Sequence, residues 1–147
     1  MAYKGKYKVK NTSKYDGNPT NVIFRSLWER QFFRWCESNN EVVKWSSESV
    51  VVPYICKTDN KLHRYFTDVK VKFKNGKTYL IEIKPEIQTQ PPKQPSRKSK
   101  KYLREVMTYV KNTSKWEAAE QYCDKRGWEF KIFTEKTLKS LGIRLLT

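Results

Sequence analysis

The chain has 147 residues, and its 31 lysines and arginines against 15 aspartates and glutamates give a formal net charge of +16. This length is typical of one domain, so we expect a single domain over residues 1–147. The charge favours nucleic acid over a membrane surface as partner, and no segment approaches the roughly 20 apolar residues that a membrane span requires.

Residues 1–20 mix lysines with tyrosines and contain no apolar targeting segment. This composition predicts a basic arm that precedes the first regular element and lies along a phosphate backbone; a solubilising surface is the alternative. We expect the protein to stay in the cytosol where it is made.

Residues 25–38 are predicted to form a helix with one buried stripe. Trp28 and Phe32 recur at helical spacing, and Ser26 with Glu29 has the Ser-x-x-Glu form of a capping box. The next elements are predicted strands at 42–45 and 49–56, which are rich in β-branched residues, and a turn at 57–61.

The register of the next hairpin can be argued from its side chains. A two-residue loop, Asn75-Gly76, would mix polar and apolar side chains on one face of the sheet. A three-residue loop over 74–76, with Gly76 left-handed, instead pairs Val69 with Ile81 and Val71 with Tyr79. One face then becomes consistently apolar, and we expect this register.

In this register Asp68 lies opposite Glu82, and Lys84 joins them on the second face while Ile83 points the other way. Two carboxylates and an ammonium would then surround one phosphate. Acidic residues that cluster in such a basic chain need a reason, and a bound divalent metal is the obvious one. The arrangement predicts metal-dependent DNA cleavage.

Residues 85–101 form a predicted loop that is rich in proline and lysine; its composition excludes helix and favours an extended, polyproline-like segment. A helix with an apolar stripe follows, and the stripe comprises Leu103, Val106, Met107 and Val110. A second helix is predicted from a Ser114–Glu117 capping box, with Trp116 in its buried face and its end near Gly127.

The chain ends with a predicted strand at 128–133 and a short helix at 134–141, capped by Thr134. Cys36, Cys56 and Cys123 are an odd set without a CxxC pair, which suggests neither a disulfide framework nor a zinc ribbon. All three are predicted to be reduced, packed thiols.

Over residues 22–133, this order of elements with Glu29, Thr67-Asp68 and Glu82-Ile83-Lys84 resembles the PD-(D/E)xK nucleases. The resemblance implies an α/β, restriction-endonuclease-like fold, in which a mixed central β-sheet is flanked by α-helices. Thr67 stands where the motif has proline, but threonine also keeps a strand extended. Within this superfamily the chain is similar to the head-completion nucleases of T-even-type tailed phages, which are related to TnsA-type transposon endonucleases. The segments that carry this likeness are 25–30, 63–68, 81–85 and 126–128.

The resemblance implies a role for each residue of the motif. Asp68 and Glu82 would be carboxylate ligands of Mg²⁺, for which Mn²⁺ can substitute. Lys84 would lie beside the scissile phosphate, orient or deprotonate the attacking water and stabilise developing negative charge. Glu29 would hold a second metal or a metal-bound water, although the capping box explains a glutamate there without any metal. One ion and two ions both remain open.

Basic side chains along the chain are candidates for contact with DNA. For His63 and Arg64 the alternative is a solvated turn, and Trp116 fits the core better than a DNA-facing role. The candidates are Lys4, Lys6, Lys8, Lys10, Arg25, His63, Arg64, Lys93, Arg97, Lys98, Lys100, Lys101, Lys111 and Lys115.

The function implied by the resemblance is a Mg²⁺-dependent DNA endonuclease of low sequence specificity that completes phage heads after DNA packaging and before tail joining. The implied partners are DNA and phage head or neck proteins, in the host cytoplasm, with association with the virion as a further expectation. A homodimer is one expected assembly, because cutting both strands usually needs two active sites. Two alternatives remain: a non-catalytic DNA-binding head protein and a partner-dependent transposition-type endonuclease.

Overall fold

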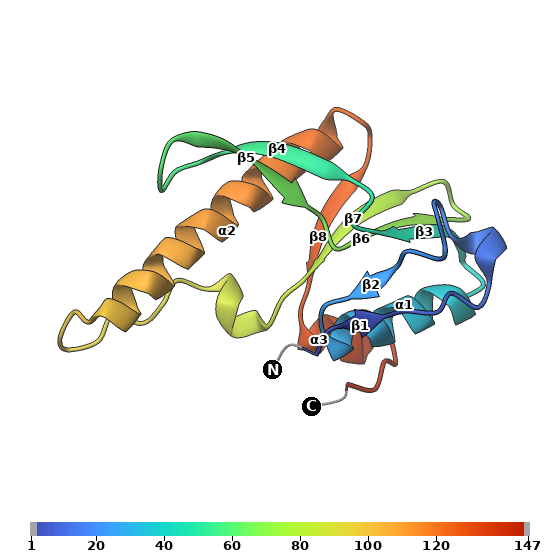
Figure 1. Ribbon diagram of the computed structural model, residues 1–147, viewed down its shortest axis with the longest axis horizontal. Coiled ribbons are helices and arrows are strands. Elements are labelled where there is room, and N and C mark those ends of the chain that lie inside the picture. Colours follow the sequence, from blue (N-terminus) through green and yellow to red (C-terminus); the bar gives the residue numbers. More distant parts are fainter. Residues whose placement is uncertain (1–2, 146–147) are drawn as a thin grey trace.

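The computed structural model of the chain describes residues 3–145; the two residues at each end of the predicted 1–147 domain lie outside this range (Figure 1). Its central sheet has the order β3 (Val42–Ser47), β6 (Val69–Phe73), β7 (Thr78–Ile83) and β8 (Glu129–Phe133). Strands β3, β6 and β7 are antiparallel, whereas β7 and β8 are parallel. The predicted α/β fold with a mixed central sheet is confirmed.

One face of this sheet is covered by α1 (Leu27–Ser38), α3 (Glu135–Ser140) and the small sheet of β1 (Gly5–Lys6) and β2 (Ile23–Phe24). The helix α1 begins as predicted, because the Ser26 side chain accepts a hydrogen bond from the Glu29 amide. Aromatic residues of α1 pack on alternate residues of the sheet, including Ile81 of β7. The predicted cap of α3 by Thr134 is also present.

The other face is covered by α2 (Lys100–Asp124) and by the hairpin of β4 (Val51–Cys56) and β5 (Lys61–Phe66). Leu80, the neighbour of Ile81, belongs to this second core together with Trp116. Successive residues of β7 therefore pack into opposite cores, so β7 is buried on both faces of the sheet. Trp116 is buried, as predicted, and the three cysteines are free and buried.

The predicted register of the β6–β7 hairpin is confirmed. Val69 pairs with Ile81 and Val71 with Tyr79. The Phe73 amide donates to the Lys77 carbonyl at 2.9 Å, which leaves a three-residue loop, and Gly76 has φ +85°. This φ lies in the left-handed region that favours glycine.

The predicted basic arm is wrong as a structural description, because residues 3–20 contain β1 and the 3₁₀ turn η1 (Thr12–Lys14). Tyr7, Val9 and Tyr15 belong to the first core. Lys14 Nζ donates to the carbonyls of Cys36, Glu37 and Asn39 at 2.7–3.1 Å, where α1 leaves its last carbonyls without partners. The segment is therefore packed against the molecule, with its other lysines outward.

Residues 100–124 form one helix where two were predicted. The Ser114 hydroxyl donates to the Val110 carbonyl at 2.8 Å, inside the helix, so the Ser-x-x-Glu pattern does not mark a helix start here. The predicted apolar stripe lies on this helix, but two of its members are not buried: Leu103 and Met107 are each 53% exposed, on the half of α2 that projects from the body in Figure 1. The helix ends before Gly127, which has φ +70°, as predicted.

Two connections also differ from the prediction. Residues 61–66 form β5, which pairs with β4, where the sequence indicated the end of a turn. The proline-rich segment includes the 3₁₀ turn η2 (Glu86–Thr89), which composition had excluded, and continues without regular structure to Ser99. Among residues 3–145, no helix combines the length and hydrophobicity that crossing a membrane requires.

Candidate active site

Asp68 lies at the junction of β5 and β6, where the backbone is held on both sides. The amide and the hydroxyl of Thr67 both donate to the Val50 carbonyl, at 3.2 and 2.9 Å. The Asp68 carbonyl accepts from the Glu48 amide at 3.2 Å. Threonine thus supplies a buried hydroxyl donor that proline would lack, and the segment just before β4, from Glu48 to Val50, fixes the position of Asp68.

Asp68 and Glu82 meet as the hairpin register predicted. Asp68 Oδ2 accepts from the Ile83 amide at 2.8 Å, and Glu82 Oε2 accepts from the Tyr65 hydroxyl at 2.9 Å. Glu82 is 6% exposed. Burial, and then the charges of Glu82 and Glu29, raise the pKa of Asp68 well above its usual value. The protein therefore holds repelling carboxylates together in a place with little water.

Glu29 comes to the same region from the first turn of α1. Its amide donates the capping bond to Ser26 Oγ at 3.2 Å, and its carboxylate accepts from the Ser26 hydroxyl at 3.5 Å, so the side chain also takes part in the cap. The side chain is buried. Burial, followed by the charges of Glu48 and Glu82, raises the pKa of Glu29 to about 7.

Two lysines border these carboxylates from different elements. Lys84 follows β7 directly, where its amide donates to the Phe133 carbonyl at 3.0 Å. Lys115 extends from α2, with its ammonium 5.5 Å from the centre of the Tyr65 ring. Burial, together with repulsion from Lys111 and Lys84, lowers the pKa of Lys115, while Glu82 acts in the opposite direction. Both lysines line one cavity with Asp68 and Glu82.

This cavity has a volume of about 810 Å³. Its remaining walls come from the segment around Tyr15 to Asn21 and from Arg25, Glu48 and Arg64. Arg25 Nε contacts Glu48 Oε1 at 2.6 Å, so one wall is an ion pair. Sequence reasoning missed Tyr65, Glu48 and the N-terminal wall, since nothing in their local patterns indicates that the fold brings them to Asp68.

The other predicted DNA contacts lie outside the cavity. Lys4, Lys6, Lys8 and Lys10 are exposed on the N-terminal segment, and Lys111 is exposed on α2. His63 does not line the cavity and pairs with Asp59 at 2.8 Å. The remaining candidates are exposed on the proline-rich loop and the first turn of α2, and they are Lys93, Arg97, Lys98, Lys100 and Lys101.

The donor set of the cavity fits a hard divalent cation. Asp68 and Glu82 line the cavity and offer carboxylate oxygens, which Mg²⁺ and Mn²⁺ prefer, and Glu29 lies close enough to Glu82 for their charges to interact. Burial is the main cause of the raised pKa of Asp68 and Glu29, and neighbouring carboxylate charges add to it, so a bound cation would favour the ionised forms. Lys84 and Lys115 add positive charge at the rim, where a phosphate would enter.

Comparison with known proteins agrees with this chemistry. Residues 39–135 match the family model of the TnsA-like endonuclease N-terminal domain. The chain belongs to this endonuclease family. It is also 43% identical over 148 aligned residues to the head completion nuclease of Enterobacteria phage T4, and the match covers 98% of this chain and 99% of that protein. The resemblance inferred from the motifs is thus confirmed, and the chain is a TnsA-like endonuclease.

Proposed function

We propose that the chain is a Mg²⁺-dependent DNA endonuclease that completes phage heads after DNA packaging and before tail joining. The name of the T4 relative and the family of the chain support the activity and the stage. The observation that supports the metal is that Asp68, which is half-buried, and Glu82, which is buried, line one cavity beside Lys84.

Asp68 and Glu82 are the proposed metal ligands, and Glu29 is a third carboxylate toward the same cation or its water. Their positions are held by the Ile83 amide, the Tyr65 hydroxyl and the first turn of α1. The bound cation would supply Lewis-acid stabilisation of the phosphate charge and a water of lowered pKa.

Lys84 is the proposed catalytic lysine, which orients the attacking water and stabilises the charge that develops on the scissile phosphate. Lys115 and Arg64, which line the same cavity, position the DNA backbone. The exposed lysines of the N-terminal segment and of the proline-rich loop extend this basic surface. Contacts of this kind read phosphates, so sequence specificity is low.

The setting proposed for this activity follows from the same relative. The protein acts as a single domain in the host cytoplasm on DNA-filled heads, together with head or neck proteins. Two copies, each cutting one strand, would give a double-strand break.

The test is cleavage of linear and supercoiled DNA in Mg²⁺, Mn²⁺ or EDTA by wild type, Asp68→Asn and Lys84→Met. Asp124→Asn is the matched control, because this exposed aspartate ends α2 and does not line the cavity. Circular dichroism checks the folding of each variant, and DNA binding is measured separately by gel shift.

We expect metal-dependent cleavage in wild type and the control, with losses of 100-fold or more, in order of magnitude, in both site variants while DNA binding persists. Equal cleavage by Asp68→Asn would remove Asp68 from the site. Tight binding without cleavage in every metal would point to a structural head protein.

A further inference from the structure

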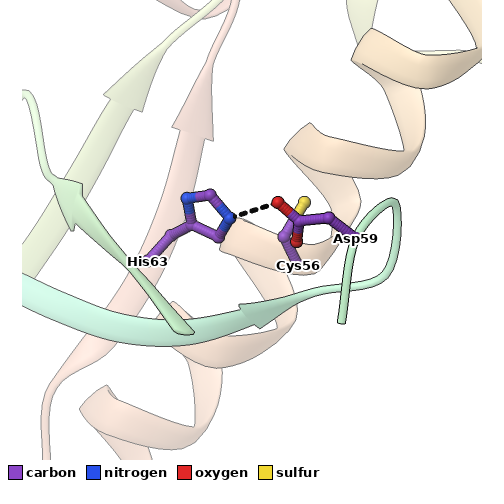
Figure 2. A group of neighbouring side chains, drawn as sticks. All are labelled: Cys56, Asp59 and His63. Atoms are coloured by element: carbon purple, nitrogen blue, oxygen red, sulfur yellow. Dashed lines mark hydrogen bonds and ion pairs between the residues drawn. The ribbon is translucent and has the colours of Figure 1, made fainter. Parts of the chain in front are cut away.

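The turn between β4 and β5 brings together three side chains that the nuclease site does not use. Figure 2 shows Cys56, Asp59 and His63 directed toward one another, and their sulfur, carboxylate oxygen and imidazole nitrogen all lie within 4.8 Å of each other. Thiol, imidazole and carboxylate are three of the ligand types that proteins use for zinc.

The hairpin backbone explains why these residues converge. Cys56 pairs with Lys61 and Tyr54 with His63, so the side chains of Cys56 and His63 lie diagonally on the same face of the hairpin. The Asp59 and Asn60 amides both donate to the Cys56 carbonyl, and Asn60 has φ +56°. This tight turn folds Asp59 back over the same face.

The two partly exposed members already hold each other. His63 Nε2 lies 2.8 Å from Asp59 Oδ2, and Asp59 Oδ1 accepts from the Lys61 amide at 3.0 Å. The His63 ring also stacks on the ring of Tyr54, with centroids 5.6 Å apart. The imidazole and the carboxylate are therefore oriented before any ligand binds.

Cys56 supplies the third donor from the buried side. The residue is 1% exposed, whereas the side chains of His63 and Asp59 are 37% and 39% exposed. A cation can reach the cluster from solvent past the histidine and aspartate, and meet the sulfur beneath. The nearest polar neighbour of that sulfur is Thr58 Oγ1, at 2.9 Å.

The separations suit a zinc ion of tetrahedral geometry. Bonds of about 2.3 Å to sulfur and about 2.0–2.2 Å to nitrogen and oxygen place neighbouring ligand atoms roughly 3.3–3.7 Å apart. The cluster needs only small side-chain rotations to reach this size from separations of at most 4.8 Å. Thiolate and imidazole disfavour Mg²⁺ and favour Zn²⁺.

We propose that Cys56, Asp59 and His63 form a second metal site, which binds one Zn²⁺ through sulfur, nitrogen and oxygen and leaves a fourth position to water. All three ligands come from one hairpin, and the other end of this hairpin carries Tyr65, which donates to Glu82. The ion stiffens the hairpin that supports the catalytic carboxylate. The site is independent of the nuclease proposal, since it shares no residue with the cavity.

The experiment is titration of metal-free protein with Co²⁺, followed by absorption spectroscopy and displacement by Zn²⁺. Cobalt bound through Cys56 gives a sulfur-to-metal charge-transfer band in the near ultraviolet, whereas cobalt at Asp68 and Glu82 meets only oxygen and gives none. We expect this band to saturate at one cobalt per chain and to disappear when Zn²⁺ is added. Absence of the band in wild type would overturn the proposal.

Variants identify the ligands. His63→Gln and Asp59→Asn should each weaken Zn²⁺ binding by more than about tenfold, and Cys56→Ser should abolish the sulfur band. Cys123→Ser is the matched control, a second buried thiol outside the cluster, and should keep the band. Retention of the band by Cys56→Ser, or its loss in Cys123→Ser with His63→Gln unaffected, would refute the assignment.

Because the Cys56→Ser variant could fail to fold, the site is also tested by the effect of zinc on the Tm of wild type and His63→Gln. His63 is partly exposed, so His63→Gln should leave the fold intact. Zinc at a hundred times its Kd should raise the Tm of wild type by about 5–10 °C. The same zinc should leave the Tm of His63→Gln nearly unchanged; an equal rise in both proteins would contradict the site.

Discussion

The replacement Glu29→Gln tests whether the nuclease cavity stores repulsion that a cation relieves. Glutamine keeps the shape of the side chain, the capping bond of its amide and one side-chain oxygen that can accept from the cap, and it removes the charge. Burial, with the charges of Glu48 and Glu82, raises the pKa of Glu29 from 4.5 to about 7. Each pKa unit corresponds to about 1.4 kcal/mol, so the ionised group costs the folded protein about 3 kcal/mol.

The sign of the pH dependence follows from where the proton is held. The folded protein keeps its proton on Glu29 up to a higher pH than the unfolded chain does. The free energy of unfolding of wild type therefore falls as the pH rises from 4.5 to about 7, and above pH 7 this loss of stability stays constant. The variant should be more stable than wild type by about 3 kcal/mol at pH 8, and by less than about 1 kcal/mol at pH 5.

The assay is urea unfolding in EDTA at both pH values, with Glu117→Gln as control. Glu117 is 62% exposed and pairs with Lys57 on the surface, so this change should alter stability by less than about 1 kcal/mol. Added Mg²⁺ should stabilise wild type and narrow its difference from Glu29→Gln. Equal stability of variant and wild type at pH 8 in EDTA would refute the reasoning.

Two further replacements test separately a residue that positions the site and a residue that stabilises the fold. Tyr65→Phe removes the hydroxyl that donates to Glu82 and should weaken the apparent affinity for Mg²⁺ by about tenfold or more. The affinity is measured from the dependence of the cleavage rate on Mg²⁺ concentration. An unchanged dependence would argue that Tyr65 does not position Glu82. Leu80→Ala removes a fully buried side chain between β7 and α2 and should lower the free energy of unfolding in urea by about 2–5 kcal/mol. A loss below about 1 kcal/mol would mean that the second core repacks to fill the space.

The β6–β7 hairpin was predictable because its determinants are local. Its three-residue loop, its left-handed Gly76 and its alternation of side chains all lie within residues 69–83 and agree with one another. The same hairpin brings Asp68 opposite Glu82, so the centre of the candidate site was predictable with it. The role of Thr67 as a donor to β4 required the structure, because Val50 is a tertiary neighbour.

The N-terminal segment shows a pattern that composition obscured. Its lysines at positions 4, 6, 8 and 10 alternate with Gly5, Tyr7 and Val9, which is the period of a strand with one buried face. Tyr7 and Val9 are indeed buried. Charge dominated the interpretation of this segment, whereas the alternation was the signal that predicts packing.

The single long helix α2, in contrast, could not be predicted from local sequence patterns. Ser114 and Glu117 have the form of a capping box, but a serine hydroxyl can also bond to the carbonyl four residues earlier, and no local pattern distinguishes the two. The exposure of Leu103 and Met107 depends on where the sheet ends relative to the helix, which is a tertiary fact. The reach of Lys115 into the cavity could not be predicted for the same reason.

The basic exterior and the acidic cavity are two sides of one arrangement. A net charge of +16 attracts DNA to the surface, but basic charge alone only binds the phosphates. Cleavage also needs acidic groups that attract a cation, which in turn activates a water. Glu29 and Glu82 are buried beneath that surface and Asp68 is half-buried beside them, and the raised pKa of Glu29 means that its charge costs the folded protein stability. Because a divalent cation lowers this cost, the folded protein should bind metal and DNA cooperatively, and each ligand should raise the apparent affinity for the other.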